Sequence, residues 1–437
     1  MTSPAASAPP EAAPAPVRHR HVFYVSGFDP KGPAHYHRLY ADEGAKAAAV
    51  GGYALEVGPR RRAGEHGAAW SVRWRGPLQP PAAAAAEVHT EVEFLRWDDL
   101  VRAHWPRHAG VLARDLLATT ALYLRTGALW RMARLAWPPV VALVVPVLVL
   151  LALLAALPLA ALASWALVRA GAPLAAGVAA VPALAAAAVL GARAIERRMN
   201  MQWLLRSYAY TGRQGTHGWP ALEARLDAFA QRIVARAEDP APCDELLVVA
   251  HSSGSIMASI ALARALQRAP GLARRGPRLA LLTLGQWSPL LSSLPGAGRF
   301  RAELATLAAE DALDWVDFTA PADGCCFALT DPVTAAGLPR PRPAHPRLLN
   351  PRFASQFSPA TYAALVRDRF RLHFQYLMAA ERAGDYDYFA LTAGPWRLGE
   401  RCAGRPSIDG YPRFQVLDRW ARRLLGPAKP PGPPASP

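Results

Sequence analysis

The sequence predicts an α/β fold in which a doubly wound, mostly parallel sheet is interrupted by a two-helix transmembrane hairpin. In the second half of the chain, apolar strand-like segments alternate with helix-like segments, which is typical of a parallel sheet covered on both faces. Two uncharged segments in the middle, 135–168 and 170–192, are each long enough to cross a hydrocarbon core of about 30 Å as a helix. The 437 residues suffice for one large α/β domain with insertions.

The first elements of this domain are expected in residues 20–108. Before them, the Ala/Pro/Ser-rich segment has no apolar core, so 1–19 is expected to be a disordered tail and not a signal peptide. A β-branched and aromatic run over 21–28 predicts a strand and a sharp turn at Gly27. The further expected elements are a helix over 35–50, strands over 53–57 and 69–75 joined by a basic turn at 60–62, a linker over 77–86 and a strand over 88–97.

Residues 109–208 are expected to attach the chain to a membrane. The predicted spans are about 138–168 and 172–192, separated by a short break at 169–173. Pro146 and Pro158 would disrupt a soluble helix but are tolerated in membrane helices. The preceding segment mixes Leu, Tyr and Trp with Arg, which favours a position along the membrane interface. The alternative is a buried pair of core helices.

Arginines flank the hairpin unevenly. The loop between the spans carries Arg169 alone, whereas several arginines lie on both outer flanks: Arg125, Arg131 and Arg134 before, and Arg193, Arg197, Arg198 and Arg206 after. The positive-inside rule therefore predicts a two-span membrane protein with both termini and the folded domain in the cytoplasm. The inner membrane of a bacterium is the expected location.

Composition narrows the classes of partner. The formal charge of +16 comes almost entirely from arginine, because the chain has three lysines. The basic residues do not interleave with aromatic ones as in nucleic-acid modules, so no nucleic-acid partner is expected. The cysteines have no zinc or redox spacing and fit a reducing compartment: Cys243, Cys325, Cys326 and Cys402. No metal or organic cofactor is expected.

The second part of the domain is expected over 209–425, followed by a disordered tail over 426–437. Pro220 begins an amphipathic helix, and the run Leu246–Val249 is a short apolar strand. The later expected elements are strands over 278–284 and 313–318, a helix over 300–310, a proline/arginine loop over 339–346 and a helical segment over 361–382.

The segment Ala250-His251-Ser252-Ser253-Gly254 joins that apolar strand to an apolar helix. A serine on such a sharp turn holds its hydroxyl out of the sheet, above the unpaired N–H groups of the helix. Here the chain resembles the α/β-hydrolase superfamily, the lipases and esterases, with alanine at the first small position of Gly-x-Ser-x-Gly. The resemblance covers roughly 20–100 and 215–400 and implies that Ser252 is a nucleophile. The alternative is a structural Ser/Gly turn that binds a phosphate.

The family order, nucleophile then acid then histidine, implies further site residues. Asp323 follows a predicted strand, where the family acid would fall; Asp317 and Asp331 are the alternatives. His373 lies among aromatic residues and is favoured as the base over His345, which lies between prolines. His251 has a supporting position in the motif.

The resemblance also implies two backbone donors for an oxyanion. One is the N–H of Ser253, the residue after the nucleophile. Val25-Ser26-Gly27-Phe28 resembles the family loop that supplies the other, which we assign to Phe28, or to Gly27 if the turn is shifted.

Together these features lead to the hypothesis of a membrane-anchored serine hydrolase that cleaves a carboxylic ester through an acyl-enzyme, with a lipid or a thioester among the possible substrates. Its partners would be the lipid bilayer and an ester or acyl substrate. Two other classes compete with it. One is a membrane-anchored scaffold with an inactive hydrolase fold. The other is a channel or transporter component, which the almost purely apolar spans disfavour.

Overall fold

The computed structural model describes residues 15–77, 85–105, 108–340 and 345–425. It is an α/β fold built on a mixed sheet with the order β2-β4-β5-β1-β6-β7-β8-β9, to which β3 is added by pairing with β4. The strands are β1 (His19–Val25), β2 (Ala54–Val57), β3 (Arg61–Arg62), β4 (Gly67–Pro77), β5 (Ala85–Leu95), β6 (Glu245–His251), β7 (Arg278–Leu284), β8 (Asp314–Phe318) and β9 (Arg347–Leu349).

Most neighbouring strands are parallel. From β5 through β1, β6, β7 and β8 to β9 every pair is parallel, whereas β4 is antiparallel to β2, β3 and β5. The expected basic turn at 60–62 is wrong in part, because Arg61 and Arg62 form β3 and pair with β4. The chain leaves β1 toward β5 on one side and later adds β6 on the other. The carboxyl ends of β1 and β6 therefore meet where ligands usually bind in open α/β sheets.

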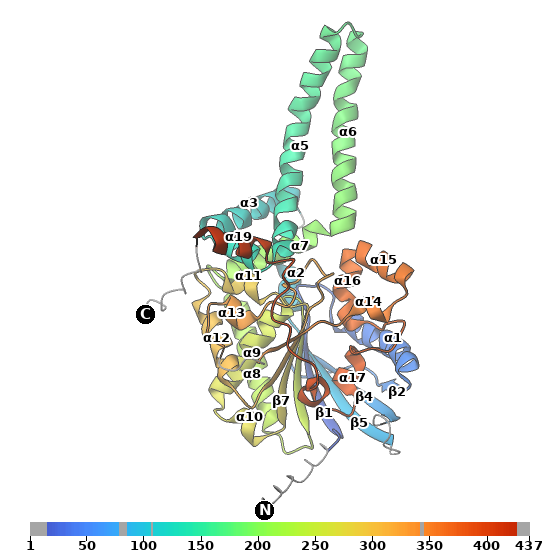
Figure 1. Cartoon of the computed structure of the whole chain (residues 1–437), viewed down its shortest axis with the longest axis vertical. Coiled ribbons are helices and arrows are strands. Elements are labelled where there is room, and N and C mark those ends of the chain that lie inside the picture. The colour runs from blue at the N-terminus through green and yellow to red at the C-terminus, as the bar shows by residue number, and fades with distance from the viewer. Residues whose placement is uncertain (1–14, 78–84, 106–107, 341–344, 426–437) are drawn as a thin grey trace, which may run out of the picture.

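Helices cover both faces of the sheet (Figure 1). Alternate residues of β6 enter two different cores, with Leu246 and Val248 on one face and Leu247 and Val249 on the other. The first core is covered by α8 (Pro220–Ala237), α9 (Gly254–Arg268), α10 (Leu272–Arg275), α11 (Ser288–Ser292), α12 (Gly298–Ala309) and α13 (Pro332–Ala335). The second is covered mainly by α1 (Pro33–Gly51), α14 (Phe353–Gln356), α15 (Pro359–Arg367), α16 (Arg369–Phe374), the 3-10 turn η1 (Gln375–Leu377), α17 (Tyr388–Ala393) and α18 (Leu398–Cys402).

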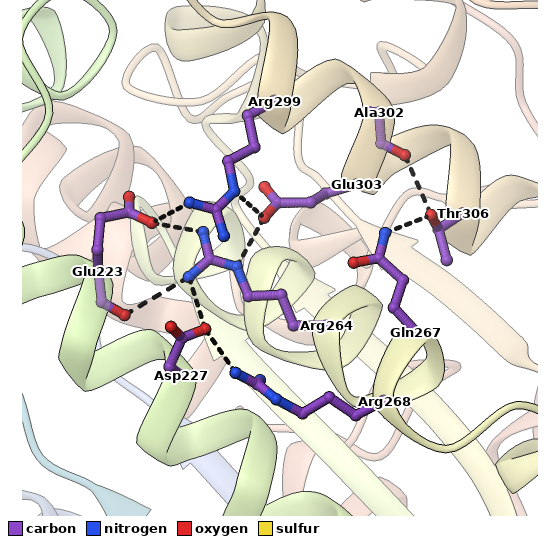
Figure 2. A network of polar contacts seen from close by, with 9 residues as sticks. All are labelled: Glu223, Asp227, Arg264, Gln267, Arg268, Arg299, Ala302, Glu303 and Thr306. Atoms are coloured by element: carbon purple, nitrogen blue, oxygen red, sulfur yellow. Dashed lines mark hydrogen bonds and ion pairs between the residues drawn. The ribbon is translucent and has the colours of Figure 1, made fainter.

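A polar network on the first face joins three of these helices (Figure 2). Arg264 of α9 bonds Glu303 of α12 at 2.7 Å and Glu223 of α8 at 2.6 Å. It also contacts Asp227 of α8 at 3.1 Å, while Arg299 of α12 bonds Glu223 at 3.0 Å. The network fixes α8, α9 and α12 against one another and so helps to hold the helix that follows Ser252.

Two apolar helices protrude from the body as a hairpin (Figure 1). They are α5 (Trp137–Arg169) and α6 (Leu174–Met199), and both are long and apolar enough to cross a membrane. Their leucines are largely exposed, including Leu148, Leu154 and Leu184. At the base of the hairpin, α3 (Ala109–Arg125), α4 (Ala128–Leu135) and α7 (Met201–Gln214) contact α5, and α19 (Val416–Leu425) contacts α4. The short helix α2 (Asp98–Ala103) follows β5.

Several expected boundaries differ from the structure. The helical segment predicted over 361–382 is broken into α15, α16 and η1, because Asp368 ends one helix and caps the next by accepting the N–H of Arg371. The predicted tail over 1–19 is wrong at its end, since Val17 is buried and its N–H donates to Pro395 O. α6 continues seven residues beyond the predicted span, to Met199. Parts of the tail, linker and loop predictions fall outside the described residues, on 1–14, 78–84, 341–344 and 426–437.

Candidate functional site

Ser252 lies on a sharp turn between β6 and α9. Its backbone is left-handed, with φ of +58°, a conformation that non-glycine residues rarely adopt. The Ser252 N–H donates to Leu284 O of the adjacent strand at 2.8 Å, which fixes the turn at the carboxyl edge of the sheet. Backbone strain of this kind clusters at functional sites, where the surrounding structure enforces it.

Two glycines allow the loop after β1 to lie against this turn. A Cβ on Gly254 would lie 2.5 Å from Ser26 O, so the first turn of α9 can approach β1 only without a side chain. A Cβ on Gly27 would lie 2.9 Å from Ser252 Cβ and 3.4 Å from Ser252 Oγ. The loop at Gly27, predicted from the sequence to face the serine, is therefore in direct contact with it.

Asp323 and His373 form a buried pair. His373 Nδ1 donates to Asp323 Oδ2 at 2.8 Å, and both side chains are 0% exposed. Burial would raise the pKa of Asp323, but the charge and hydrogen bond of His373, with the N–H of Cys325, hold that pKa below its usual value. Asp323 is therefore ionised at neutral pH. Its Oδ2 accepts the proton on His373 Nδ1, so Nε2 is the ring nitrogen left to exchange a proton with another group.

Two further side chains support this pair. Tyr376 donates its hydroxyl to Asp323 Oδ2 at 3.2 Å and accepts the N–H of Ala320 at 2.8 Å. His251 donates from Nε2 to the carbonyl oxygen of His373 at 2.8 Å. Burial lowers the pKa of His251 to about 3, so this ring is neutral and acts as a hydrogen-bond donor. The aromatic run around His373 was noted in the sequence, but the role of Tyr376 could not be read from it.

Ser252 and His373 are neighbours with unused polar atoms. Ser252 Oγ and His373 Nε2 are both buried, and neither atom forms a hydrogen bond with any described residue. They therefore do not bond each other. Two contacts bring the segments that carry them close together. His251, next to Ser252, bonds the His373 backbone, and a Cβ on Gly285, next to Leu284, would lie 3.4 Å from His373 Cε1. In unliganded sites such hydrogen bonds are often long and shorten when substrate binds.

The alternative acid and base residues lie elsewhere. Asp317 accepts the hydroxyl of Thr283 at 2.5 Å, and burial raises the pKa of Asp317 to about 7. Asp331 caps α13 by accepting the N–H of Val333. His345 is buried, with Nε2 3.2 Å from Leu307 O. The structure thus pairs Asp323 with His373, whereas Asp317, Asp331 and His345 bond other groups.

The predicted oxyanion donors are only partly available. The N–H of Phe28 donates to Ser253 Oγ at 2.8 Å, so it is engaged by a side chain. Ser253 is the N-cap residue of α9 and follows Ser252 directly, as the family motif requires. Phe28 and Ser253 are thus in direct contact, and an oxyanion would have to replace the hydroxyl of Ser253 at the N–H of Phe28.

One group of side chains has the spacing of metal ligands: a ligand atom from each of Asp323, Cys325 and His373 lies within 4.8 Å of the others. Two of the three are already bonded to each other through Oδ2 and Nδ1. Burial raises the pKa of the Cys325 thiol, whereas a metal needs the thiolate. The donor set therefore fits a carboxylate–histidine pair better than a metal centre.

Comparison with known proteins finds no matching family model, no matching curated protein and no matching solved structure. The resemblance to the α/β-hydrolase superfamily therefore rests on the residues of the chain itself. The geometry of the site has to support any functional assignment.

Proposed function

We propose that this chain is a membrane-anchored serine hydrolase with a doubly wound α/β-hydrolase fold. The observation that carries the proposal is the meeting of two unusual features. A serine with a left-handed backbone follows His251, which bonds the backbone of a buried Asp–His pair, and Ser252 Oγ and His373 Nε2 have no hydrogen-bond partner among the described residues. A serine hydroxyl needs such a base, and the base needs a third group that fixes its tautomer.

The proposed reaction is the hydrolysis of a carboxylic ester or thioester. Ser252 Oγ attacks the carbonyl carbon while His373 Nε2 takes its proton. His373 then protonates the leaving alcohol or thiol, and an acyl-enzyme remains on Ser252. A water molecule, deprotonated by His373, releases the acid. Asp323 orients His373 throughout, and the N–H groups of Ser253 and Phe28 would stabilise the oxyanion once the Ser253 hydroxyl turns away from Phe28.

The anchor in this proposal is the α5–α6 hairpin, with the folded domain in the cytoplasm. Support comes from the length and apolar composition of both helices and from the arginines at their body-side ends. Proteolysis of oriented vesicles tests the orientation. The domain should be cleaved in inside-out vesicles, and its protection there would contradict the proposed topology.

Labelling by a fluorophosphonate probe tests the reaction. The wild-type protein should be labelled, and Ser252→Ala should abolish labelling. Ser259→Ala is the matched control, because Ser259 is a fully buried serine of α9 without a partner among the described residues. This variant should be labelled like wild type. Absence of Ser252-dependent labelling in folded protein would refute the hydrolase.

A second candidate is an inactive scaffold with the same fold and anchor. The specific observation in its favour is that Ser252 and His373 share no hydrogen bond while the N–H of Phe28 is engaged by Ser253. The same labelling experiment separates the two candidates, because a scaffold would leave Ser252 unlabelled.

A further inference from the structure

The candidate site is closed by aromatic side chains at the foot of the hairpin. Trp203 lies in the first turn of α7, directly after α6. Its ring centroid is 6.0 Å from that of His373, and its Nε1 donates to Phe28 O at 2.8 Å. Trp203 thus bridges the predicted base and the predicted oxyanion loop. It is part-buried, whereas Ser252 and His373 behind it are fully buried.

Two other rings complete this cover, which we call the aromatic roof: Trp203, Trp287 and Phe370. Phe370 meets the Trp203 ring edge-on at 5.4 Å, and Trp287 lies 6.5 Å from it. Phe370 belongs to α16, the helix that carries His373. The roof therefore joins α7, which follows the hairpin, to the helix of the base.

Both feet of the hairpin touch the walls of the site. Tyr208 of α7 donates its hydroxyl to Pro139 O in the first turn of α5. A Cβ on Gly324, the residue after Asp323, would lie 3.9 Å from Pro138 of α5, and α6 contacts α16. Figure 1 shows the hairpin rising above the end of the sheet at which these segments lie.

The segments between the hairpin and the site pack in one apolar core. One hydrophobic core includes Leu143 of α5, Leu204 and Tyr208 of α7, and Trp287 and Phe28 at the site. Moving an acyl chain from a bilayer into water costs about 0.8 kcal/mol per methylene, or about 10 kcal/mol for a chain of about 13 carbons. A substrate that passes along apolar side chains at the hairpin avoids most of that penalty.

We infer that the substrate of Ser252 is an acyl ester lipid resident in the bilayer, which enters at the feet of α5 and α6 when Trp203 moves away from His373. This inference rests on the proposed hydrolase function and names its substrate class. In the closed arrangement, the roof keeps water-soluble esters from Ser252. The hairpin is then both the anchor and the entrance for substrate.

The test uses the full-length protein in lipid nanodiscs. A fluorogenic diacyl phospholipid in the nanodisc and p-nitrophenyl butyrate in solution are offered to wild type and to Trp203→Ala. Wild type should hydrolyse the lipid and only slowly hydrolyse the soluble ester. Trp203→Ala should raise kcat/KM for the soluble ester and the rate of fluorophosphonate labelling by about tenfold, without raising lipid hydrolysis.

Trp219→Ala is the matched control. Trp219 is also part-buried, and its Nε1 likewise donates to a backbone carbonyl, Tyr210 O at 3.2 Å. This variant should leave both rates unchanged. Trp203→Phe keeps a ring but loses the bond to Phe28 O, so it should give a smaller gain and guards against misfolding of the alanine variant.

The outcomes separate the two proposals. If Ser252 is labelled in every variant, but wild type already hydrolyses the soluble ester as fast as the lipid and neither Trp203 variant changes the ratio, the bilayer entrance is refuted and the hydrolase stands. If Ser252 is labelled in no variant, including folded Trp203→Phe, the hydrolase itself is refuted.

Discussion

The Arg264 network and the Ser252 site are both buried polar clusters, yet they are built in opposite ways. Arg264 is 5% exposed, and each of its guanidinium nitrogens bonds an oxygen of Glu223, Asp227 or Glu303 (Figure 2). Burial alone would lower the pKa of Arg264, but its bonds to Glu303 and Glu223 raise that pKa, so the guanidinium stays charged. In the Ser252 site, Ser252 Oγ and His373 Nε2 are buried without a hydrogen-bond partner among the described residues.

The difference separates a cluster that holds helices together from one whose unpaired atoms the proposed reaction would use. A buried polar group without a partner costs about 1–3 kcal/mol, so native structures contain few of them. In the Arg264 network this penalty is avoided. Ser252 Oγ and His373 Nε2 bear this penalty beside a strained backbone, and the proposed hydrolase function would give both atoms a use in the reaction.

The largest expected effect is on reactivity. Asp323→Asn keeps the shape of the side chain but stabilises the wrong tautomer of His373, so ester hydrolysis should fall by about 10⁴-fold. Thermal unfolding in detergent should change little. The kinetics can be followed with any ester that wild type hydrolyses. Retention of more than a tenth of the activity would remove Asp323 from the proposed role.

The opposite result is expected for Arg264→Met, which leaves buried Glu303 with only the more distant, exposed Arg299 as a cation. Removing one member of a buried ion pair should lower the free energy of unfolding by about 3 kcal/mol, while the folded protein keeps its activity. Arg299→Met is the control, since Arg299 is 65% exposed and contacts the same carboxylates. This variant should lower the free energy of unfolding by less than about 1 kcal/mol. Equal losses in both variants would show that burial does not set the difference.

Asp317 is a third kind of buried group, a carboxyl with hydroxyl partners in place of a cation. Its pKa of about 7 in the folded protein lies above the ordinary value of 3.8. The unfolded chain therefore loses this proton first, and the stability contributed by protonated Asp317 is lost as pH rises from about 4 to 7. Asp317→Asn should remove this loss. The free energy of unfolding of the variant, relative to that of wild type, should therefore rise by roughly 2 kcal/mol between pH 5 and 7. Unfolding at the two pH values measures it, and a constant difference would contradict the prediction.

The smallest effect concerns the Ser252 backbone itself. Glycine adopts a positive φ without steric penalty, whereas alanine does not, so Ser252→Gly should be more stable than Ser252→Ala by about 1 kcal/mol. Both should be inactive. Melting temperatures of the two variants in the same detergent give the comparison. An alanine variant as stable as the glycine variant would show that the turn relaxes when the hydroxyl is removed.

Local patterns in the sequence predicted much of the fold. The turn at Ser252 follows from an apolar run, small residues and an apolar helix that are contiguous in the chain. The two apolar helices follow from uncharged stretches. The pairing of Asp323 with His373 was predicted from the family order and agrees with the hydrogen bond between them. Their catalytic roles remain predictions.

What the sequence could not provide depends on contacts between distant segments. Trp203 lies 170 positions before His373, and nothing local indicates that their rings meet. In the sequence, nothing distinguishes Arg264 from the many other arginines. Its partners Glu303 and Glu223 come from α12 and α8, which only the fold places beside it. The break at Asp368 was detectable, because an aspartate three residues before Arg371 is a typical helix start.

The left-handed turn at Ser252 has a consequence for how this gene changes over generations. Glycine or asparagine would relieve the turn, so in a lineage with no use for the hydroxyl such replacements would improve folding and accumulate by drift. Under the proposed function, the serine would persist only where natural selection acts on its chemistry. Descendants that keep the sheet and the hairpin but carry glycine at this position would then be those in which the proposed reaction has been abandoned.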